Sequence, residues 1–504
     1  MKNIFYYLTV ILLMVASVSC DLDKYPYDAI EQSQAFKTLS DAGTIRNGLY
    51  GNMRSRLHGI YMFSTDVQAD LLNATLDFGN RNGFPHRWEG FLDTDYTIRD
   101  VWRGYYSALV NVNNAIAMLP SIETANDTEK ATLDSYIGEA YFLRAYYYHQ
   151  LVLRWGKAYD PTSAASDLGV PLVLTFDVTA KPARATVDEV YKQILSDLTE
   201  AKTKLSGVAG SPGSNRITID AVTALQARIH LHMRNWTEAA TAAKSLITGG
   251  KYPLVKSEAD FRKIWVNDAG SELIFQLQLV APQELSPSGD PWNNVNNIFL
   301  GFQPSTGKYV PDFVPQQWVI DLYENTDFRK NVYLAKKPLY IQGTDYPDIY
   351  LINKYPGNPA LFTGATTNYQ HKPKVLRIAE MYLIAAEADA QSTGGESAAL
   401  TLLNQLRQAR GAKELAGLSG AALMNEIRNE RTRELLCEGF RLDDLRRWNL
   451  GFTRKTPQNL NLINVTPSAD YHQKTVQAGD LKFTWGLPAN DLTTNPNLVQ
   501  NQGW

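Results

Sequence analysis

Residues 220–250 read DAVTALQARIHLHMRNWTEAATAAKSLITGG, and this stretch decides the fold. Asp220 stands where a helix N-cap is expected, at the start of an apolar run of helical period that ends near Met233. After a turn at residues 234–236, a second run of the same period fills residues 237–247 and stops at two glycines. The stretch therefore predicts two consecutive helices joined by a short turn.

Small residues at the helix contacts relate this pair to helices later in the chain. The alanines at these positions are Ala224, Ala227, Ala239, Ala243, Ala385, Ala386, Ala390 and Ala399. Such pairs resemble tetratricopeptide repeats, whose period is about 34 residues. The early and late pairs are separated by a long aromatic-rich segment. We therefore predict a mainly α fold, in which a tetratricopeptide-like helix-pair scaffold carries a loop-rich, aromatic-rich insertion subdomain.

Helical periodicity recurs through most of the chain. Further helical runs cover residues 40–56, 100–119, 128–155, 188–205, 376–391, 397–410 and 420–438. By contrast, residues 251–373 hold about half of the 23 prolines, and only short runs such as Leu273–Val280 look like strands. The predicted parts are a signal peptide (1–19), a lipid anchor and tether (20–40), an N-terminal helical scaffold with ligand-facing loops (41–250), a loop-rich subdomain (251–375), and C-terminal helical pairs with an irregular tail (376–504).

The first twenty residues have the pattern of an export signal. Lys2 precedes an apolar run from Ile4 to Ala16 and a small-x-small cleavage site at residues 17–19. The run is too short to span a membrane, which takes about 20 apolar residues. Two interpretations place the cut at the same bond. Either an ordinary signal peptidase cuts there, or Cys20 is acylated on its sulfur and becomes the mature N-terminus, although Ser17 departs from the aliphatic residue that lipoprotein signals prefer.

Cysteine content and net charge limit which disulfides and which partners the chain can have. Cys20 and Cys437 are the only cysteines in 504 residues, so no disulfide remains if Cys20 carries lipid. Cys437 lies in a helical pattern, where a buried and unreactive thiol is expected. The net charge of −3 gives no reason to expect a nucleic-acid partner. No later stretch is long and apolar enough to span a membrane, so we expect membrane contact through the N-terminal lipid only.

Motifs of the common enzyme classes are missing from the sequence. We find no G-x-S-x-G, no P-loop, no G-x-G-x-x-G and no H-E-x-x-H. Glu430, Glu434 and Glu438 share one face of a predicted helix and could suggest acid–base chemistry. Arginines within residues 431–441 would lower the pKa values of these carboxylates, which is unsuitable for a general acid near neutral pH. A salt-bridged structural network is the favoured interpretation, and we expect no catalysis, no metal and no cofactor.

Two loops rich in aromatic residues, 78–96 and 286–318, are the better candidates for a binding site. Trp and Tyr rings stack on sugar rings, while Asn, Arg and Asp side chains hydrogen-bond to hydroxyl groups. The candidate ligand-binding residues are Asn73, Arg81, Phe84, His86, Trp88, Trp292, Asn293 and Tyr309. The alternative for any single ring is that it fills the core beneath a long loop.

Several motifs in a fixed order give the chain a resemblance to a known family. They are WRGYY at 102–106 with NVNNA at 111–115, GEAYFLRAYYY at 138–148, GVPL at 169–172, AEMYLIAAEA at 379–388, LNQLR at 403–407, the charged stretch 430–448, and WGLP at 485–488 with NPNLVQNQG at 495–503. Together they resemble the SusD-like (RagB/SusD) nutrient-binding lipoproteins of the outer membrane. The resemblance covers the whole mature chain.

This resemblance implies a scaffold anchored at the outer membrane by lipid on Cys20 and facing the cell exterior. Asp21 and Asp23 resemble the surface-export signal of such lipoproteins. The implied partner is a TonB-dependent barrel transporter of the SusC-like kind, and the usual ligand is a glycan. We therefore expect a non-enzymatic lipoprotein that captures oligosaccharide or polysaccharide and delivers it to the transporter. The alternatives are a peptide-binding member of the family, a secreted glycoside hydrolase and a scaffold that binds only proteins.

Overall fold

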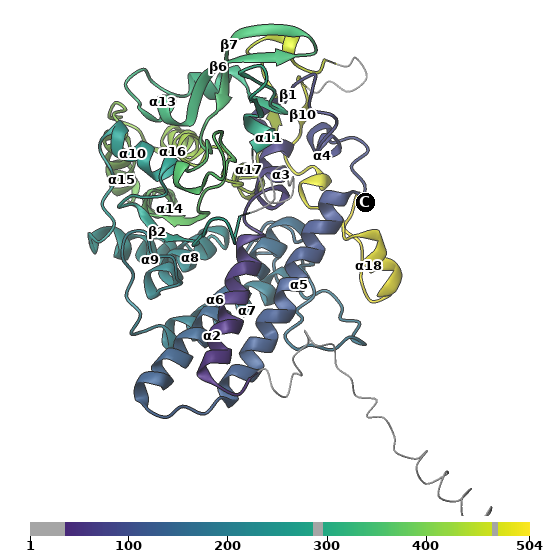
Figure 1. Cartoon of the computed structure of the whole chain (residues 1–504), viewed down its shortest axis with the longest axis vertical. Coiled ribbons are helices and arrows are strands. Elements are labelled where there is room, and N and C mark those ends of the chain that lie inside the picture. Colours follow the sequence, from purple (N-terminus) through teal and green to yellow (C-terminus); the bar gives the residue numbers. More distant parts are fainter. Residues whose placement is uncertain (1–35, 286–295, 466–471) are drawn as a thin grey trace, which may run out of the picture.

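The computed structural model describes residues 36–285, 296–465 and 472–504, and it confirms the mainly α fold. The long helices are α2 (Leu39–Arg54), α5 (Tyr96–Met118), α6 (Asp127–Trp155), α7 (Val187–Lys204), α8 (Ile219–His232), α9 (Trp236–Thr248), α14 (Ile378–Ala390), α15 (Glu396–Ala409) and α16 (Gly420–Glu434). Each packs on the next in the order α5, α6, α7, α8, α9, α14 and α15 (Figure 1). The early and late helix pairs, which are far apart in the sequence, are therefore neighbours in space.

The predicted pair at residues 220–250 is confirmed as α8 and α9, with one correction at its start. Thr218 rather than Asp220 is the N-cap of α8, because its hydroxyl accepts a hydrogen bond from the backbone N–H of Ala221 at 3.3 Å. Asp220 lies in the first turn, where a negative charge suits the helix N-terminus. Its Oδ2 also accepts a hydrogen bond from the hydroxyl of Tyr252 at 2.7 Å.

Shorter elements build the rest of the described chain. The short helices are α3 (Ile60–Gln68), α4 (Gly83–Arg87), α10 (Glu258–Val266), α11 (Asn296–Phe299), α12 (Gln317–Asp321), α13 (Arg329–Tyr333), α17 (Arg441–Arg447) and α18 (Ala489–Thr494), with 3₁₀ turns at Leu119–Ser121, Pro359–Leu361, Leu460–Leu462 and Leu481–Phe483. The strands are β1 (Leu72–Ala74), β2 (Leu273–Gln276), β3 (Phe302–Gln303), β4 (Lys308–Tyr309), β5 (Phe313–Pro315), β6 (Leu334–Ile341), β7 (Thr344–Ile352), β8 (Lys374–Arg377), β9 (Phe452–Thr453) and β10 (Thr475–Val476). They form the pairs β1–β5, β2–β8 and β9–β10, and a sheet in the order β3-β4-β6-β7.

The part predicted as loop-rich contains a long hairpin that its sequence did not reveal. β6 and β7 pair antiparallel around Gln342 and Gly343, which both have positive φ (45° and 80°), as tight hairpin turns require. Pro338 and Pro347 lie within the two strands and disturb the strand pattern in the sequence. The strand predicted at residues 273–280 is confirmed over its first half as β2.

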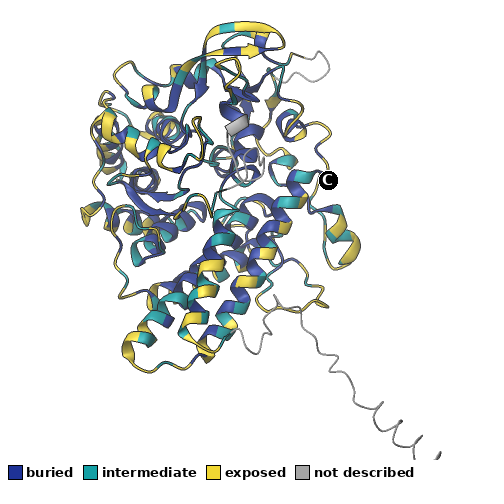
Figure 2. Cartoon of the chain, in the orientation of Figure 1, coloured by how far each residue is buried: buried dark blue, intermediate teal, exposed yellow. Residues whose placement is uncertain are grey.

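One hydrophobic core extends through the scaffold and the loop-rich part (Figure 2). It also holds the irregular C-terminal tail. The indole N–H of Trp155 donates to the carbonyl oxygen of Gly486 at 2.8 Å, and that of Trp485 donates to Oε1 of Gln68 at 2.8 Å. Both rings are fully buried, with their centroids 5.5 Å apart. Because each buried aromatic side chain removes roughly 150–250 Å² from water, these contacts fix the tail against α6 and α3.

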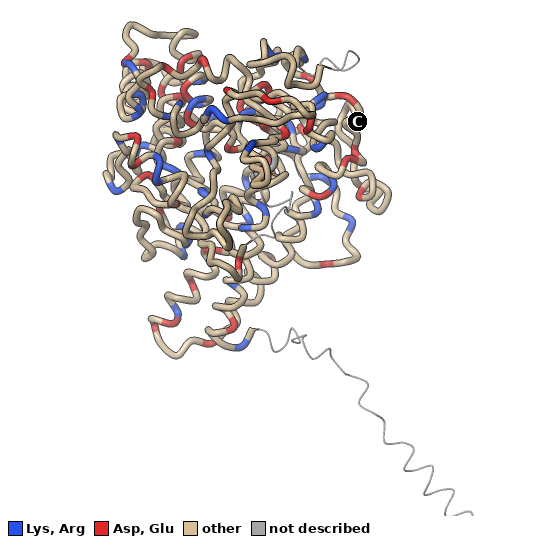
Figure 3. The backbone as a smooth tube through the Cα atoms, turned by 45° about the horizontal axis from the view of Figure 1, so that its top comes forward, with Lys and Arg blue, Asp and Glu red and all other residues tan. Residues whose placement is uncertain are grey.

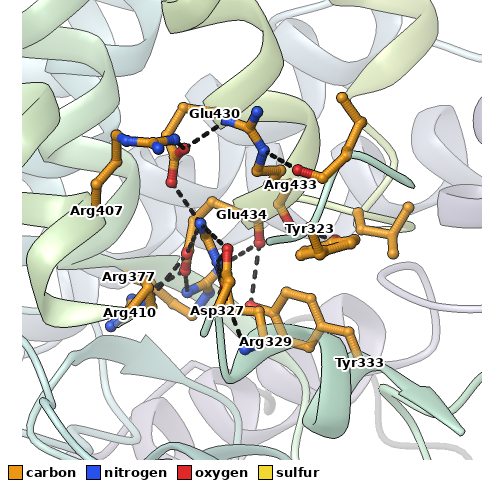
Figure 4. Close-up of polar contacts among 12 residues, drawn as sticks. Tyr323, Asp327, Arg329, Tyr333, Arg377, Arg407, Arg410, Glu430, Arg433 and Glu434 are labelled. Atoms are coloured by element: carbon orange, nitrogen blue, oxygen red, sulfur yellow. Dashed lines mark hydrogen bonds and ion pairs between the residues drawn. The ribbon is translucent and has the colours of Figure 1, made fainter. Parts of the chain in front are cut away.

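A buried cluster of charged side chains joins the scaffold to the loop-rich part (Figure 4). Glu434, at the end of α16, receives hydrogen bonds from Nε and Nη2 of Arg410, each 3.0 Å long. Nη1 of Arg377 lies 2.8 Å from the same carboxylate, and Nη1 of Arg329 lies 3.0 Å from it. Arg410 also reaches Glu272, next to β2, at 2.8 Å. The predicted salt-bridged network is therefore confirmed, but its partners are corrected. Of the three arginines predicted beside these carboxylates, Arg433 pairs with Glu430, whereas Arg431 pairs with Asp444 and Arg441 with Asp70.

Electrostatics inside this cluster keep its carboxylates ionised. Burial on its own raises the pKa of Glu430, but three neighbouring guanidinium groups, first that of Arg329, outweigh burial and lower the pKa to about 2. The same balance lowers the pKa of Glu434 well below its usual value. Neither group can donate a proton near neutral pH, so the cluster is structural.

The helix predicted over residues 420–438 is too long at its C-terminal end. α16 ends at Glu434, and Cys437 has a φ of +54°, which is outside the helical region. Glu438 therefore leaves the predicted helix face and lies 2.6 Å from Nζ of Lys354. Cys437 is buried, as predicted for an unreactive thiol, and burial raises its pKa.

Replacing Glu434 by Gln tests the role of the cluster. The amide leaves three buried guanidinium groups short of a counter-charge, so we expect E434Q to lower the free energy of unfolding by about 3–5 kcal/mol. Urea unfolding at pH 7 measures the loss. The matched control is E258Q, which removes one partner of an exposed pair with Arg262 and should cost less than about 1 kcal/mol. Equal losses in both variants would contradict the assignment.

Candidate functional site

The chain after β1 is fixed on both sides by backbone hydrogen bonds. β1 pairs with β5, and the next two residues continue this arrangement. The N–H of Thr75 donates to the carbonyl oxygen of Asp312 at 2.9 Å, and the N–H of Leu76 donates to that of Leu462 at 3.1 Å. The loop over residues 77–92 therefore starts from a rigid base. This base brings together the two aromatic loops that the sequence marks as candidates.

The tip of the β6–β7 hairpin lies against the start of this loop. The backbone N–H of Gln342 donates to Oδ2 of Asp77 at 3.1 Å, and its Nε2 donates to the carbonyl oxygen of Leu76 at 3.1 Å. The hairpin and α4 lie at the same end of the molecule (Figure 1). We define the loop surface as residues 77–92 together with β3, β4 and the β6–β7 hairpin.

An ion pair ties the loop to the residue before β5. Nε of Arg81 lies 2.6 Å from Oδ2 of Asp312, and Nη2 contacts the other carboxylate oxygen. The Arg81 side chain is half exposed, whereas that of Asp312 is 1% exposed. Burial raises the pKa of Asp312 to about 6, against the opposing effect of Arg81. The buried carboxylate thus relies on this arginine for its counter-charge.

Three predicted ligand residues point into the interior. Trp88 is 7% exposed, and its indole N–H donates to the carbonyl oxygen of Gln68 at 2.7 Å. Nδ1 of His86 lies 2.7 Å from the carbonyl oxygen of Val67, and His86 and Asn73 are both buried. The predicted position of these three side chains at a ligand surface is therefore corrected to the protein interior. They support the loop from below, because α4 and β1 turn them toward the core.

Two predicted aromatic residues do reach the loop surface. Phe84 is 38% exposed, with the guanidinium group of Arg87 4.7 Å from its ring centre. Tyr309 on β4 is half-buried and lies 5.0 Å from the ring of Phe302. Both rings therefore present part of their area to solvent. The predicted ligand residues that lie outside the described part of the chain are Trp292 and Asn293.

Tyr340 and Asn82 also lie at this surface, although no sequence pattern marked them as candidate residues. Tyr340 is partly exposed on β6, with Nζ of Lys308 5.2 Å from its ring centre. Oδ1 of Asn82 is buried and has no hydrogen-bond partner in the described chain. Asn82 has a φ of +54°, which asparagine tolerates better than most residues. Tyr340 was missed because the hairpin itself was not predicted.

The described residues show no arrangement typical of metal binding or membrane spanning. No group of three or more His, Cys, Asp or Glu side chains could hold a metal ion in this part of the chain. None of its helices is long and apolar enough to cross a membrane. Basic and acidic residues are interspersed along the backbone (Figure 3), in keeping with the net charge of −3. The loop surface is therefore characterised by aromatic rings and hydrogen-bonding groups.

A concavity away from the loop surface, the α5 groove, has a volume of about 880 Å³. Its walls are α5, the segment 171–182 and α18. The hydroxyl of Tyr106 donates to the carbonyl oxygen of Pro171 at 2.9 Å, and Nδ2 of Asn495 donates to that of Pro182 at 2.9 Å. Three segments that are distant in the sequence build this groove, so no local sequence pattern reveals it.

Comparison with known proteins places the chain among relatives of one kind. A model described as the SusD family matches residues 322–504, and one described as starch-binding associating with outer membrane matches residues 22–231. SusD-like protein P38 of Formosa agariphila is 24% identical, with 99% of each chain covered. A SusD superfamily structure from Bacteroides thetaiotaomicron is 25% identical with a TM-score of 0.78, covering 92% of this chain and 99% of that one. A laminarin-binding SusD-like protein has a TM-score of 0.69 at 20% identity, covering 93% of this chain and 100% of that one.

The helix-pair scaffold and the loop surface define a class of protein, in which a tetratricopeptide-like frame holds a face built from distant loops. Within this class, the chain is similar to the SusD-like proteins, because models of two SusD-like families match residues 322–504 and 22–231 and SusD-like protein P38 aligns with it over 99% of its length. The matched residues include both the early scaffold and the C-terminal helix pairs.

Replacing Arg81 by Ala tests how the loop is held. Without the arginine, the charged form of the buried Asp312 has no counter-charge, while the protonated form needs none. Because the pKa of Asp312 is raised to about 6, the stability lost in R81A is present above that pH and disappears below it. We expect a loss of about 1 kcal/mol at pH 8, since the half-exposed arginine is partly screened, and a smaller one at pH 5.

Urea unfolding of R81A and wild type at the two pH values makes this measurement. The control is R99A, which breaks the more exposed pair of Arg99 with Asp100 and should change little at either pH. A loss in R81A that is the same at pH 5 and pH 8 would contradict the role given to Asp312.

Proposed function

We propose that this chain is a cell-surface glycan-binding lipoprotein that captures oligosaccharide or polysaccharide and delivers it to a TonB-dependent SusC-like transporter in the outer membrane. The match of residues 322–504 to the SusD family model supports this proposal, as does the laminarin-binding SusD-like protein of the same fold. The description of the matched N-terminal model, starch-binding associating with outer membrane, points the same way.

The observation that carries the proposal is the connection between the two loops that hold the partly exposed rings of Phe84 and Tyr309. They come from distant parts of the sequence, yet the pairing of β1 with β5 and the Arg81–Asp312 ion pair bring their loops together. An exposed ring face suits the apolar face of a sugar ring. The guanidinium group of Arg81, half exposed on the same loop as Phe84, can donate to sugar hydroxyl groups.

Capture rather than cleavage fits the carboxylates at this surface. A glycoside hydrolase needs two carboxyl groups roughly 5–10 Å apart, one of them able to donate a proton. Asp312 has a pKa raised to about 6, but its side chain is 1% exposed and paired with Arg81, so a glycosidic oxygen has no access to it. Asp77 accepts the backbone N–H of Gln342. We therefore propose no enzymatic role. Release of reducing sugar by the purified protein would instead support the hydrolase alternative.

The proposed anchor is lipid on Cys20. The first described helix begins at Leu39, so a segment of residues 20–38 would connect the lipid to the folded domain. An extended chain of this length reaches roughly 60 Å. Such a tether lets the domain stay close to a transporter in the same membrane while its loop surface meets soluble glycan.

Alanine variants of the two exposed rings test glycan binding. We expect F84A and Y309A each to weaken binding by about five- to tenfold, because each loses roughly 1 kcal/mol of ring contact. Isothermal titration calorimetry with laminarin and with starch oligosaccharides measures the change. The control is F176A, since Phe176 is exposed on a segment outside the loop surface.

Two results would overturn parts of this assignment. Wild-type binding strength in both F84A and Y309A would remove the loop surface as the glycan site. Binding to a peptide array with no binding to any glycan on a matched array would favour the peptide-binding alternative.

Metabolic labelling tests the anchor. We expect the wild-type chain to incorporate radioactive palmitate and to fractionate with the outer membrane. The Cys20→Ala variant should be unlabelled and released, because it lacks the sulfur that accepts the acyl chain. A wild-type protein that stays unlabelled would leave a secreted or periplasmic binder.

A further inference from the structure

The α5 groove has an apolar edge that the described chain leaves uncovered. Leu174, Phe176 and Val178 occupy alternate positions of one wall segment and are all exposed, Phe176 by 58% and Val178 by 81%. The groove floor includes Trp102 and Tyr106, whose rings lie 4.6 Å apart. A run of exposed apolar side chains beside an aromatic-floored concavity indicates a surface that another segment covers.

The rim of the groove carries unneutralised positive charge. Arg103 and Lys181 are exposed, and neither takes part in an ion pair in the described chain. Arg99, by contrast, pairs with Asp100 at 2.7 Å. Of the acidic side chains in the groove walls, Asp491 accepts a hydrogen bond from the indole N–H of Trp102 at 3.1 Å, and Asp177 accepts one from the hydroxyl of Thr179 at 2.7 Å. The groove therefore fits an extended segment that combines acidic and aromatic residues.

The chain's own tether has this composition. Residues 20–35 read CDLDKYPYDAIEQSQA, with four acidic residues, one lysine, two tyrosines, Leu22 and Ile30. Pro26 favours an extended backbone for the residue before it. We propose that residues 20–35 dock in the α5 groove, with their acidic side chains toward Arg103 and Lys181 and their tyrosines toward the apolar edge.

The chain geometry allows this docking. α2 packs against α5 and α6, and Nε of Arg56, just after α2, donates to the carbonyl oxygen of Gly104 at 2.5 Å. The first helix of the described chain thus lies beside α5. Sixteen extended residues reach roughly 50 Å, whereas the 23 residues of α5 span about 34 Å. The tether can therefore reach every part of the groove.

Docking would give the tether a role beyond that of a spacer between the lipid and the folded domain. Opposite charges and an apolar contact would hold the mature N-terminus on one face of the domain, so the face that turns toward the membrane would be set. This inference does not depend on glycan binding by the loop surface. It also stands without lipidation, because the contact lies within one polypeptide chain.

Photo-cross-linking within the mature chain, residues 20–504, tests the docking. Cys20→Ser keeps the protein free of lipid, and Tyr27 is replaced by p-benzoylphenylalanine. After illumination of the monomer, peptide mapping by mass spectrometry should place the cross-links in residues 99–110, 171–182 or 489–498. Raising the salt concentration from 0.15 M to 1 M should lower the yield, since ion pairing is screened.

Charge reversal makes the test specific. We expect R103E combined with K181E to reduce the groove cross-links at least fivefold, and added D21K and D23K substitutions in the tether to restore much of the yield. The control is K202E combined with K256E, which makes the same charge change at exposed lysines outside the groove and should leave the yield unchanged.

Other outcomes would overturn the proposal. Cross-links that join two copies would make a second molecule the occupant of the groove. Cross-links elsewhere on the domain would show that the tether does not dock in the groove. So would a yield of groove cross-links that is unchanged by charge reversal. Equal urea midpoints for all variants confirm that each comparison concerns folded protein.

Discussion

The carboxylate of Glu434 is the point on which the architecture depends. It meets arginines from α13, from β8 and from the end of α15, all buried with it. Through Arg410 the same cluster reaches Glu272 beside β2. Taking so many charges out of water is costly, and it succeeds because each group faces an opposite charge at hydrogen-bond distance. The insertion between α9 and α14 is thereby held to the scaffold at one place.

This constraint matters for the loop surface because the insertion supplies both Arg329 of the cluster and the β3, β4, β6 and β7 strands of the loop surface. α13, which carries Arg329, leads directly into β6, and β7 returns toward the cluster through Lys354 and its contact with Glu438. The hairpin is therefore fixed at its base by ion pairs and at its tip by Gln342. A loop-rich region gains a rigid frame in this way, although few of its residues belong to regular secondary structure.

Much of the fold could be predicted because long helices leave a strong periodic pattern. The sequence indicated α8 and α9 together with their alanine contacts, and the predicted end of α16 was wrong by one turn. The β6–β7 hairpin was missed because prolines and exposed lysines hide its alternation. Stacking of α14 on α8 and α9 was beyond single-sequence reasoning, since the contact between such distant segments leaves no local pattern.

The candidate site shows why composition alone does not distinguish aromatic residues that support a loop from those that are exposed to a ligand. Trp88 and Phe84 are four residues apart in one glycine-containing loop, yet Trp88 packs on Phe483 while Phe84 meets solvent. The difference follows from tertiary pairing, because β1 and β5 decide which way α4 turns. A ring held from below by buried neighbours loses little freedom when a ligand covers it. Under the proposed function, the buried aromatic residues therefore contribute to binding indirectly, by keeping the exposed ones in place before the glycan arrives.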